Sequence, residues 1–441
     1  MKTKTKSSLL TGIFTLVMIF GTFTLVIGIV RADSPTFTVT PSGGDDTANI
    51  QAAFDDAIAA GPGSIVLLTP GQFYTNAIIA ENFYGTFMGA GMGLTKIDVL
   101  RGLDSGAPGV SSPYGPHLFT FIGGDTYISD LCFEITPYSP AEPWGPGWDD
   151  LLAPILIAGD INSRIEDVKF TGHEGTILYD PWHPLFSVKS FNVRVGVEYG
   201  GGLPTTGRHI VTKCDFSSLW LGITAYGLMN CEFTIKSNSI KEGAIGIINA
   251  EVDNSKLEIS RNYIETTFFG GIWVMQPPPR ESPSQWLITH NTIKVLSLDS
   301  DGISLMDFSP KSLEAVVLNN KIILDDANWG AIWTQGLQDA FFSNNIIRGT
   351  GSYGIFCASA YNNLLLGNNV QNVDAQAAPI VLAYSFNCIV VGGSTKTNVL
   401  NFGGDNNLIV GMNNMQGNPP GPEIQEAMER KREFVQSFPK F

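Results

Sequence analysis

The sequence is poor in charge, and basic residues are scarcer than acidic ones. Only 15% of its 441 residues are charged, and 26 lysines and arginines face 41 aspartates and glutamates, a net charge of −15. Four of the basic residues and none of the acidic ones lie in residues 1–32, which leaves 22 basic against 41 acidic residues in the rest. So acidic a surface repels phosphate backbones, which argues against nucleic acid as a partner. The apolar fraction of 44% excludes a wholly disordered chain.

Cysteine is also scarce, and its spacing excludes the common metal and disulfide frameworks. The five cysteines are Cys132, Cys214, Cys231, Cys357 and Cys388. They show no CxxC spacing, and no histidine accompanies them as a metal site would require. An odd number leaves at least one thiol free or bonded between chains. We interpret all five as small buried hydrophobic residues.

Long apolar runs are absent after residue 30. Before it, the uncharged apolar run 9–30 follows three lysines and is followed by Arg31 and Ala32. Such a pattern is typical of a secretory signal, with Val30 and Ala32 as small residues for cleavage, although 22 residues can also cross a bilayer. We therefore expect residues 1–32 to be a signal peptide or an N-terminal membrane anchor. Both place the chain outside the cytoplasm, extracellular or at the cell surface, with membrane contact only through this segment if it is not cleaved.

What the sequence has in abundance is a repeat built on asparagine. An Asn with isoleucine two places later recurs at Asn238, Asn262, Asn291, Asn320 and Asn345. Asn369, with Val370 directly after it, continues the series, and Asp215, Asn192 and Asp167 extend it backwards. Successive members lie 23 to 29 residues apart. Repeats of this length indicate a solenoid.

Each repeat contains a second signal, a glycine followed by an aliphatic strand, as in Gly222-Ile223, Gly246-Ile247 and Gly271-Ile272. A repeat this short cannot bury its own apolar face, so successive repeats must coil and stack. We expect the Asn to adopt the left-handed conformation of a turn and to stack from coil to coil. A Leu-x-x-Leu-x-Leu frame and a 3.6-residue period are absent, and the spacing is too short for a propeller blade. The pattern predicts an all-β, right-handed parallel β-helix with three strands per coil over residues 33–418.

The N-terminal stretch carries a family resemblance. Asp45-Asp46-Thr47, then 50–54, Gly61-Pro62-Gly63 and 71–74, resembles the opening of polygalacturonase-like and pectate-lyase-like chains of the pectin-lyase-like superfamily. The resemblance implies a parallel β-helix that opens with a cap helix. The residues agree, because Ile50, Ala53, Phe54, Ala57 and Ile58 form one helical stripe and Gly61-Pro62 ends it.

The repeat ends at Pro419-Pro420-Gly421-Pro422. Residues 423–438 are charged and helix-prone, with Ile424, Met428, Val435 and Phe438 roughly on one side. Residues 419–441 therefore form a C-terminal helical cap or a loose tail.

In the superfamily the substrate groove runs along one strand face, which the order of turns identifies here as the Gly-aliphatic strand. Its outward positions are predicted to be Thr224, Ile248, Trp273, Ser304, Trp333 and Phe356. If exposed, Trp273, Trp333 and Phe356 offer flat platforms for sugar rings, which predicts a polysaccharide or cell-surface glycan as the partner. The alternative is that loops cover these rings.

Acidic residues cluster around two of these strands. Asp299 and Asp301 precede one, and Asp325 and Asp326 precede the next. Paired carboxylates can act as acid and base on a glycosidic bond, can hold Ca²⁺, or can simply be solvated. No other cofactor is indicated. His173, in the loop of an earlier coil, is a candidate substrate-binding residue and proton shuttle.

The specific motifs of the family are incomplete. Asp325-Asp326 and Gly172-His173-Glu174 resemble polygalacturonase motifs, but they stand in reversed order and no Arg-x-Lys pair follows. Pectate lyases use an arginine base, and Arg194, Arg208 and Arg280 are present without a matching motif. Two functions stay open: an exported carbohydrate-active protein that binds and cleaves a polysaccharide as a lyase or glycoside hydrolase, and a non-catalytic surface or adhesive β-helix.

Overall fold

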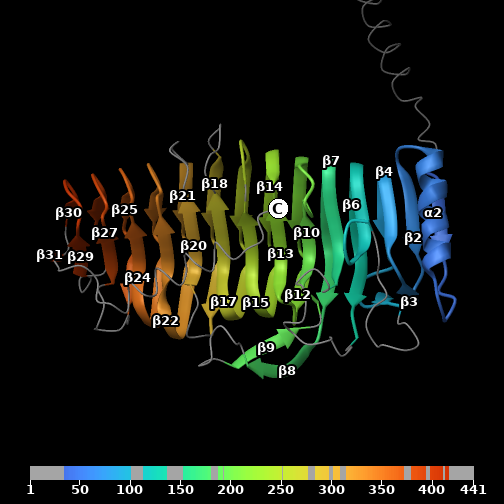
Figure 1. Ribbon diagram of the computed structural model, residues 1–441, viewed down its shortest axis with the longest axis horizontal. Helices are drawn as coiled ribbons and strands as arrows, with labels where there is room; N and C mark the ends of the chain where they lie inside the picture. The colour runs from blue at the N-terminus through green and yellow to red at the C-terminus, as the bar shows by residue number, and fades with distance from the viewer. Residues whose placement is uncertain are drawn as a thin grey trace, which may run out of the picture.

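The computed structural model describes most of the chain between residues 34 and 416 (Figure 1). The described ranges are 34–100, 113–136, 152–179, 187–191, 193–250, 252–276, 284–296, 301–307, 314–371, 379–393, 398–410 and 413–416, with the backbone alone at 174–179, 187–191, 267–269, 326–329 and 413–416. The predicted leader and the predicted C-terminal helix lie outside these residues. Within them, no helix is both long and apolar enough to cross a membrane.

Nearly all of this chain is one parallel sheet of 29 strands, wound into an elongated coil (Figure 1). The N-terminal coils contain β1 (Thr36–Val39), β2 (Ser64–Leu68), β3 (Gly71–Thr75), β4 (Ile78–Met88), β5 (Thr95–Val99), β6 (His117–Glu134) and β7 (Ala153–Thr171). The central coils contain β10 (Val195–Tyr199), β11 (Thr205–Thr212), β12 (Asp215–Ser217), β13 (Leu221–Tyr226), β14 (Leu228–Lys236), β15 (Ser239–Ala250), β16 (Lys256–Ser260), β17 (Tyr263–Gln276), β18 (Gln285–Thr289), β19 (Thr292–Val295), β20 (Asp301–Asp307), β21 (Glu314–Leu318) and β22 (Lys321–Gln335). The last coils contain β23 (Phe341–Ser343), β24 (Ile346–Ala358), β25 (Leu364–Leu366), β26 (Asn369–Gln371), β27 (Ile380–Ala383), β28 (Ile389–Val391), β29 (Asn398–Phe402), β30 (Leu408–Val410) and β31 (Asn413–Gln416).

The strands stack in three columns, as predicted. Column 1 runs through β10, β13, the ends of β15 and β17, β20, the ends of β22 and β24, β27, β29 and β31. Column 2 runs through β11, β14, β16, β18, β21, β23, β25, β28 and β30. Column 3 runs through β12, the starts of β15 and β17, β19, the starts of β22 and β24, and β26. Outside this sheet, β8 (Glu174–Tyr179) and β9 (Ser187–Phe191) form an antiparallel hairpin between column 3 and column 1.

The Gly-aliphatic strands supply the core, because their aliphatic residues stack in register. Ile223, Ile247, Ile272, Ile303, Ile332 and Ile355 pair in sequence from coil to coil, and none is exposed. The glycines in front of them are needed for space: a Cβ on Gly246 would lie 2.5 Å from the carbonyl oxygen of Gly271. All five cysteines are free and buried, which confirms their interpretation as small hydrophobic residues.

The asparagines form a buried ladder between columns 2 and 3. Its members are Asn238, Asn262, Asn291, Asn320, Asn345 and Asn368. Each side-chain oxygen accepts hydrogen bonds of 2.9–3.1 Å from the backbone N–H and the side-chain amide of the preceding member. The predicted column of superposed asparagines therefore exists.

Three details of the predicted ladder are wrong. Its last member is Asn368, not Asn369, so Val370 takes the usual place two residues later. Cys214, not Asp215, precedes Asn238, since the Cys214 N–H donates to the Asn238 side chain at 2.9 Å. Asp167 occupies the position one residue before the ladder, with φ 54°. Asn192 lies outside the described residues.

The left-handed residue also differs from the prediction. It is the residue before each ladder asparagine: Ser237, Arg261, His290, Asn319 and Asn344, with φ between 53° and 58°, and Gly367 with φ 63°. The turn needs one such residue, and the fold places it in front of the asparagine, whose side chain then points along the stack.

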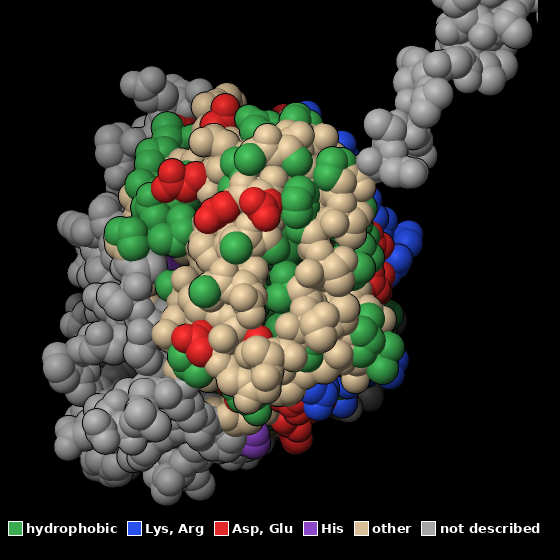
Figure 2. All heavy atoms as spheres, turned by 90° about the vertical axis from the view of Figure 1, so that its right-hand side faces the viewer, with side chains coloured by type: hydrophobic (Ala, Val, Ile, Leu, Met, Phe, Trp, Pro, Cys, Tyr) green, Lys and Arg blue, Asp and Glu red, His purple; other side chains and the backbone are tan. Residues whose placement is uncertain are grey.

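The predicted N-terminal cap helix is α2 (Thr47–Ala60). It buries Ile50, Ala53, Phe54 and Ala57, and the Phe54 ring packs against the rings of Phe83 and Phe87, both at 5.2 Å between centroids. The helix ends at Gly61, whose φ of 94° suits glycine. Figure 2 looks at this end of the molecule, where hydrophobic and acidic side chains are scattered among other side chains and backbone. α2 thus closes an end that would otherwise expose the core.

Candidate functional site

The outer face of column 1 has the register that the sequence predicts, but its three aromatic side chains are buried. Ile248, Trp273, Ser304, Trp333 and Phe356 pair in that order on adjacent coils. Trp273 and Trp333 are each 2% exposed and Phe356 is 1% exposed, so the expectation of an exposed aromatic platform is wrong.

The buried rings belong to a second apolar layer outside the solenoid core. Trp273 lies in a cluster with Trp220 and Ile248, whereas Trp333 and Phe356 lie in another cluster with Met306 and Tyr353. Rings on coils about 4.8 Å apart gain more by packing against their neighbours than by facing water. Their predicted role in binding substrate stays a prediction.

Of the four predicted carboxylates, the structure describes the side chains of Asp301 and Asp325, and these two differ in burial. Asp301 is buried and accepts hydrogen bonds from the Ser304 hydroxyl at 2.7 Å and the Tyr353 hydroxyl at 3.2 Å. Burial raises the pKa of Tyr353, which keeps its hydroxyl a donor. Asp325 is exposed, and Asp299 and the Asp326 side chain lie outside the described residues.

His173 is exposed and lies between β7 and β8. In the described part of the chain, no group of three or more His, Cys, Asp and Glu side chains is arranged to hold a metal ion. The suggested Ca²⁺ site therefore has no described set of ligands.

A different ionised group does occupy the outer face of column 1. Glu198 pairs with Thr224 in β13 and so belongs to the same outward row. Its carboxylate lies 3.0 Å from His117 Nε2 and accepts a hydrogen bond from Arg194. The side chains of His117, Arg194 and Glu198 are 3%, 12% and 9% exposed. We refer to these three residues as the His–Arg–Glu cluster.

The electrostatics of this cluster keep Glu198 charged. Burial acts to raise the pKa of Glu198, but the Arg194 guanidinium and the hydrogen-bonded His117 hold it below its ordinary value. His117 Nδ1 and Arg194 Nε are both buried and have no hydrogen-bond partner among the described residues. Buried polar atoms without partners are rare because they are costly, and a ligand oxygen is a natural partner for them. The cluster can therefore hold an oxygen-rich ligand and move a proton through the imidazole.

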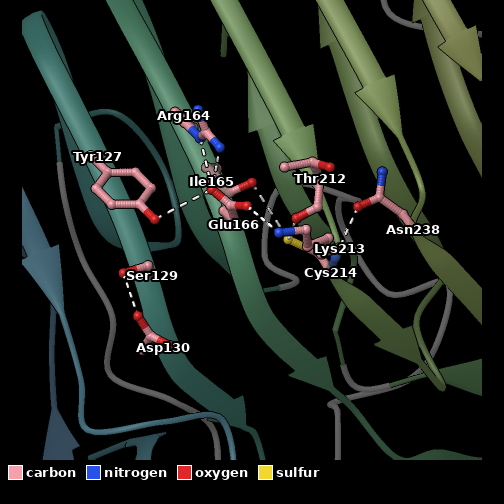
Figure 3. Close-up of polar contacts among 10 residues, drawn as sticks. All are labelled: Tyr127, Ser129, Asp130, Arg164, Ile165, Glu166, Thr212, Lys213, Cys214 and Asn238. Carbon is pink, nitrogen blue, oxygen red and sulfur yellow. Dashed lines mark hydrogen bonds and ion pairs between the residues drawn. The ribbon is translucent and has the colours of Figure 1, made fainter.

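A second ionic network, on column 2, joins three coils rather than forming a site (Figure 3). Glu166 accepts hydrogen bonds from Lys213 at 2.7 Å, from Tyr127 at 3.4 Å and from Arg164. The hydrogen bonds from Lys213 and Arg164 hold the pKa of Glu166 below its ordinary value. Because the Arg164 and Lys213 side chains are more than half exposed, water can hydrogen-bond their remaining N–H groups.

No family model and no curated protein sequence matches this chain. Solved structures do match its fold. The Dettilon tailspike protein superposes with a TM-score of 0.53 at 13% identity, over 85% of this chain and 68% of that one. DFA-IIIase from Arthrobacter chlorophenolicus A6, in complex with DFA-III, superposes with a TM-score of 0.51 at 12% identity, over 88% and 99%. The A-module of mannuronan C-5 epimerase AlgE6 from Azotobacter vinelandii superposes with a lower TM-score of 0.46 at 15% identity, over 86% of this chain and 93% of that one.

The chain is a right-handed parallel β-helix, as the tailspike and DFA-IIIase structures are. At 12–13% identity the likeness establishes the fold and leaves the activity to the residues of the site.

In this β-helix, sequence reasoning missed Glu198 and His117 and noted Arg194 only as an available arginine. A signal for Glu198 was present, because Gly196-Val197-Glu198 repeats the order of Gly222-Ile223-Thr224 and so places a carboxylate at an outward position. His117 belongs to no motif, since it reaches the cluster from a strand two coils earlier in column 1.

Proposed function

We propose that the protein is a carbohydrate-active β-helix that binds a polysaccharide at the outer face of column 1 and acts on it at the His–Arg–Glu cluster. The observation that carries the proposal is a buried Glu198 carboxylate held between His117 and Arg194, each of which keeps one buried nitrogen that has no hydrogen-bond partner in the described part of the chain. The fold supports the substrate class, since one structure with this fold contains DFA-IIIase in complex with DFA-III.

The chemistry follows from the charges. Glu198 orients the His117 ring through Nε2, so the imidazole can take a proton from a sugar carbon or hydroxyl, or give one to a leaving oxygen. Arg194 provides a positive charge for an anionic oxygen. A polysaccharide lyase needs both roles, whereas a glycoside hydrolase would also need a second carboxylate near Glu198.

Distance separates this cluster from Asp301. Glu198 and Ser304, the partner of Asp301, occupy the same outward row four strand spacings apart. Four spacings amount to about 19 Å, whereas two carboxylates that act on one glycosidic bond lie about 5 to 9.5 Å apart. Asp301 and Glu198 therefore do not form a catalytic pair, and we assign Asp301 to the packing around Tyr353.

We also propose that the protein works outside the cytoplasm. The support is the basic and apolar pattern of residues 1–32 together with the acidity of the remaining chain. N-terminal sequencing of the protein recovered from the culture medium and from membranes tests this proposal, because a cleaved signal gives a soluble chain that begins near residue 33.

A second function, a non-catalytic surface or adhesive β-helix, is favoured by one observation. The rings of Trp273, Trp333 and Phe356 are at most 2% exposed, so they stabilise the wall of the solenoid in this conformation.

Product release separates the two functions. The purified protein is incubated with a panel of acidic and neutral polysaccharides, with and without Ca²⁺, and released ends and unsaturated products are measured. We expect Glu198→Gln and His117→Gln to abolish release while glycan binding persists. The matched control is Glu166→Gln, which removes a buried carboxylate on column 2 and should retain activity.

Unchanged release by Glu198→Gln would exclude the cluster as the reacting site. Binding without release from any polymer would favour the adhesive function.

A further inference from the structure

Column 2 carries an exposed apolar surface at its C-terminal half. One outward row, in register from coil to coil, consists of Leu287, Val316, Phe341, Leu364, Ile389 and Leu408. A neighbouring row contains Leu318, Leu366, Val391 and Val410, and the stacked rings of Tyr361 and Phe386 flank them with centroids 5.2 Å apart. We call these residues the C-terminal apolar face. Leu408 is 54% exposed, Val410 45% and Leu366 40%.

The face is confined to this part of the molecule. Towards the N-terminus its first row continues as Glu258 and Thr234, so the outward residues change from polar to apolar at Leu287. Exposed apolar residues are normal when scattered, but a continuous surface over six coils marks a site of contact.

The path of the chain indicates what covers it. In the last described coil, six residues connect Asn401 of column 1 to Leu408, where column 2 begins. Gln416 is in register with Asn401 one coil later, and six residues, 417–422, follow it. Residue 423 can therefore reach the level of Leu408, at the end of the apolar face.

The residues after this point favour a helix over another coil. Pro419, Pro420 and Pro422 have no N–H for a strand ladder, and proline suits the entry to a helix. A helix over residues 423–438 would be about 24 Å long at 1.5 Å per residue. The row from Leu408 back to Leu287 spans five strand spacings, also about 24 Å.

We propose that residues 423–438 form an amphipathic helix that docks on the C-terminal apolar face and runs back towards Leu287. Ile424 then lies over Leu408, Met428 near Ile389 and Leu364, and Phe438 near Leu287. A second copy of the chain is the poorer occupant, because the face is about 24 Å long and its two rows lie about 7 Å apart. Its area is therefore well below the about 800 Å² per partner of a standard interface. The inference is independent of the proposed activity, since the C-terminal apolar face is on column 2 and the His–Arg–Glu cluster is on column 1.

Cysteine labelling tests the docking in the full-length protein. The native thiols stay silent, because burial raises the pKa of Cys132 to about 11 and that of Cys214, Cys231 and Cys357 to about 12, and also raises the pKa of Cys388. The probe variant is Ile389→Cys, treated with a water-soluble maleimide. We expect its labelling to accelerate at least tenfold when Ile424→Asp and Met428→Asp are added.

The control variant is Arg208→Cys, which points outward from column 2 in the polar half and is 68% exposed. Its labelling rate should not respond to the two Asp substitutions. Equal rates for Ile389→Cys with and without those substitutions would overturn the proposal. So would protection that grows with protein concentration, which would assign the face to a second copy.

A disulfide provides a second measurement. Ile389→Cys combined with Met428→Cys should form an intramolecular disulfide on mild oxidation, whereas Ile389→Cys combined with Arg430→Cys should not, because Arg430 faces away on the same helix. Equal yields for the two pairs would contradict a docked helix of this orientation.

Discussion

Glu198 bears a negative charge where burial opposes it, and only its two partners make this possible. Removing one member of such a group leaves the charge of the others buried and uncompensated. Glu198→Gln should therefore lower the free energy of unfolding by about 3 kcal/mol at neutral pH. Because the pKa of Glu198 is lowered on folding, its contribution is present above the unfolded value and disappears as the pH falls through the folded value.

Urea unfolding of wild type and Glu198→Gln at neutral pH and at about pH 3 measures this difference. The difference in the free energy of unfolding between wild type and Glu198→Gln should be smaller at the lower pH. Glu166→Gln is the control. Its partners Arg164 and Lys213 are more than half exposed, so losing the two ion pairs should cost about 1 kcal/mol or less. A difference that is constant with pH would mean that Glu198 is not ionised in the folded protein.

His209 also predicts a pH dependence of stability, but here burial favours the neutral form of the side chain, whereas Glu198 is kept charged. His209 is fully buried inside the solenoid with Nδ1 3.0 Å from the Ser163 hydroxyl, and burial lowers its pKa to about 4. The unfolded chain binds the proton more readily, so stability should fall as the pH drops from about 6.5 towards 4, by about 3 kcal/mol in all.

The matched pair for this prediction is His209→Gln and His290→Gln. His290 is exposed, so its replacement should leave the slope of stability against pH unchanged. His209→Gln should flatten the slope between pH 4 and 6.5, whatever its cost at neutral pH. A wild-type slope in His209→Gln would assign the effect to other groups.

At the scale of the element, the asparagine ladder is the most directly testable device. The Asn291 side chain accepts from the N–H and side-chain amide of Asn262 and donates to the Ile259 carbonyl at 2.9 Å. Asn291→Ala leaves these groups buried without partners, which should cost about 2 to 4 kcal/mol in chemical unfolding.

Asn344→Gly is the control for the ladder. Asn344 precedes the ladder residue Asn345, is exposed and has φ 53°, a conformation that glycine adopts without strain. Its replacement should change stability by less than about 1 kcal/mol. A larger loss from Asn344→Gly than from Asn291→Ala would reverse the roles assigned to the two positions.

The ladder also shows where sequence reasoning succeeds and where it fails. Asn-x-Ile predicts the ladder wherever a single Asn marks the turn, as at Asn262 and Asn291. At Asn368-Asn369 two candidates stand side by side; Val370, two places after Asn368, fits the pattern for the first, and the hydrogen bond from Asn345 identifies it. At Cys214 the ladder residue has no amide, so the neighbouring Asp215 imitates the pattern.

Over the whole molecule, periodicity determines the coil but not what covers it. The repeat correctly placed Trp273 and Trp333 on the outer side of column 1, because alternation along a strand and register between strands are local properties. Their burial was not predictable in the same way, since it depends on the side chains that pack around them, such as Trp220 and Tyr353, which the repeat does not specify. For the same reason the His–Arg–Glu cluster escaped notice: His117 and Glu198 are 81 residues apart and share no motif.

The cysteines allow a prediction for the folded molecule as a unit. They lie in different coils, all buried, and burial raises the pKa of each thiol, to about 12 for Cys214, Cys231 and Cys357. The native protein should therefore react with a thiol reagent at about pH 8 more than a hundredfold slower than a free cysteine, because both access and the thiolate are lacking. Denaturant should release five fast-reacting thiols, and a reductant should leave the unfolding midpoint unchanged since no disulfide is present. A native thiol that reacts as fast as free cysteine would show that at least one coil opens readily, against the continuous core on which the whole solenoid depends.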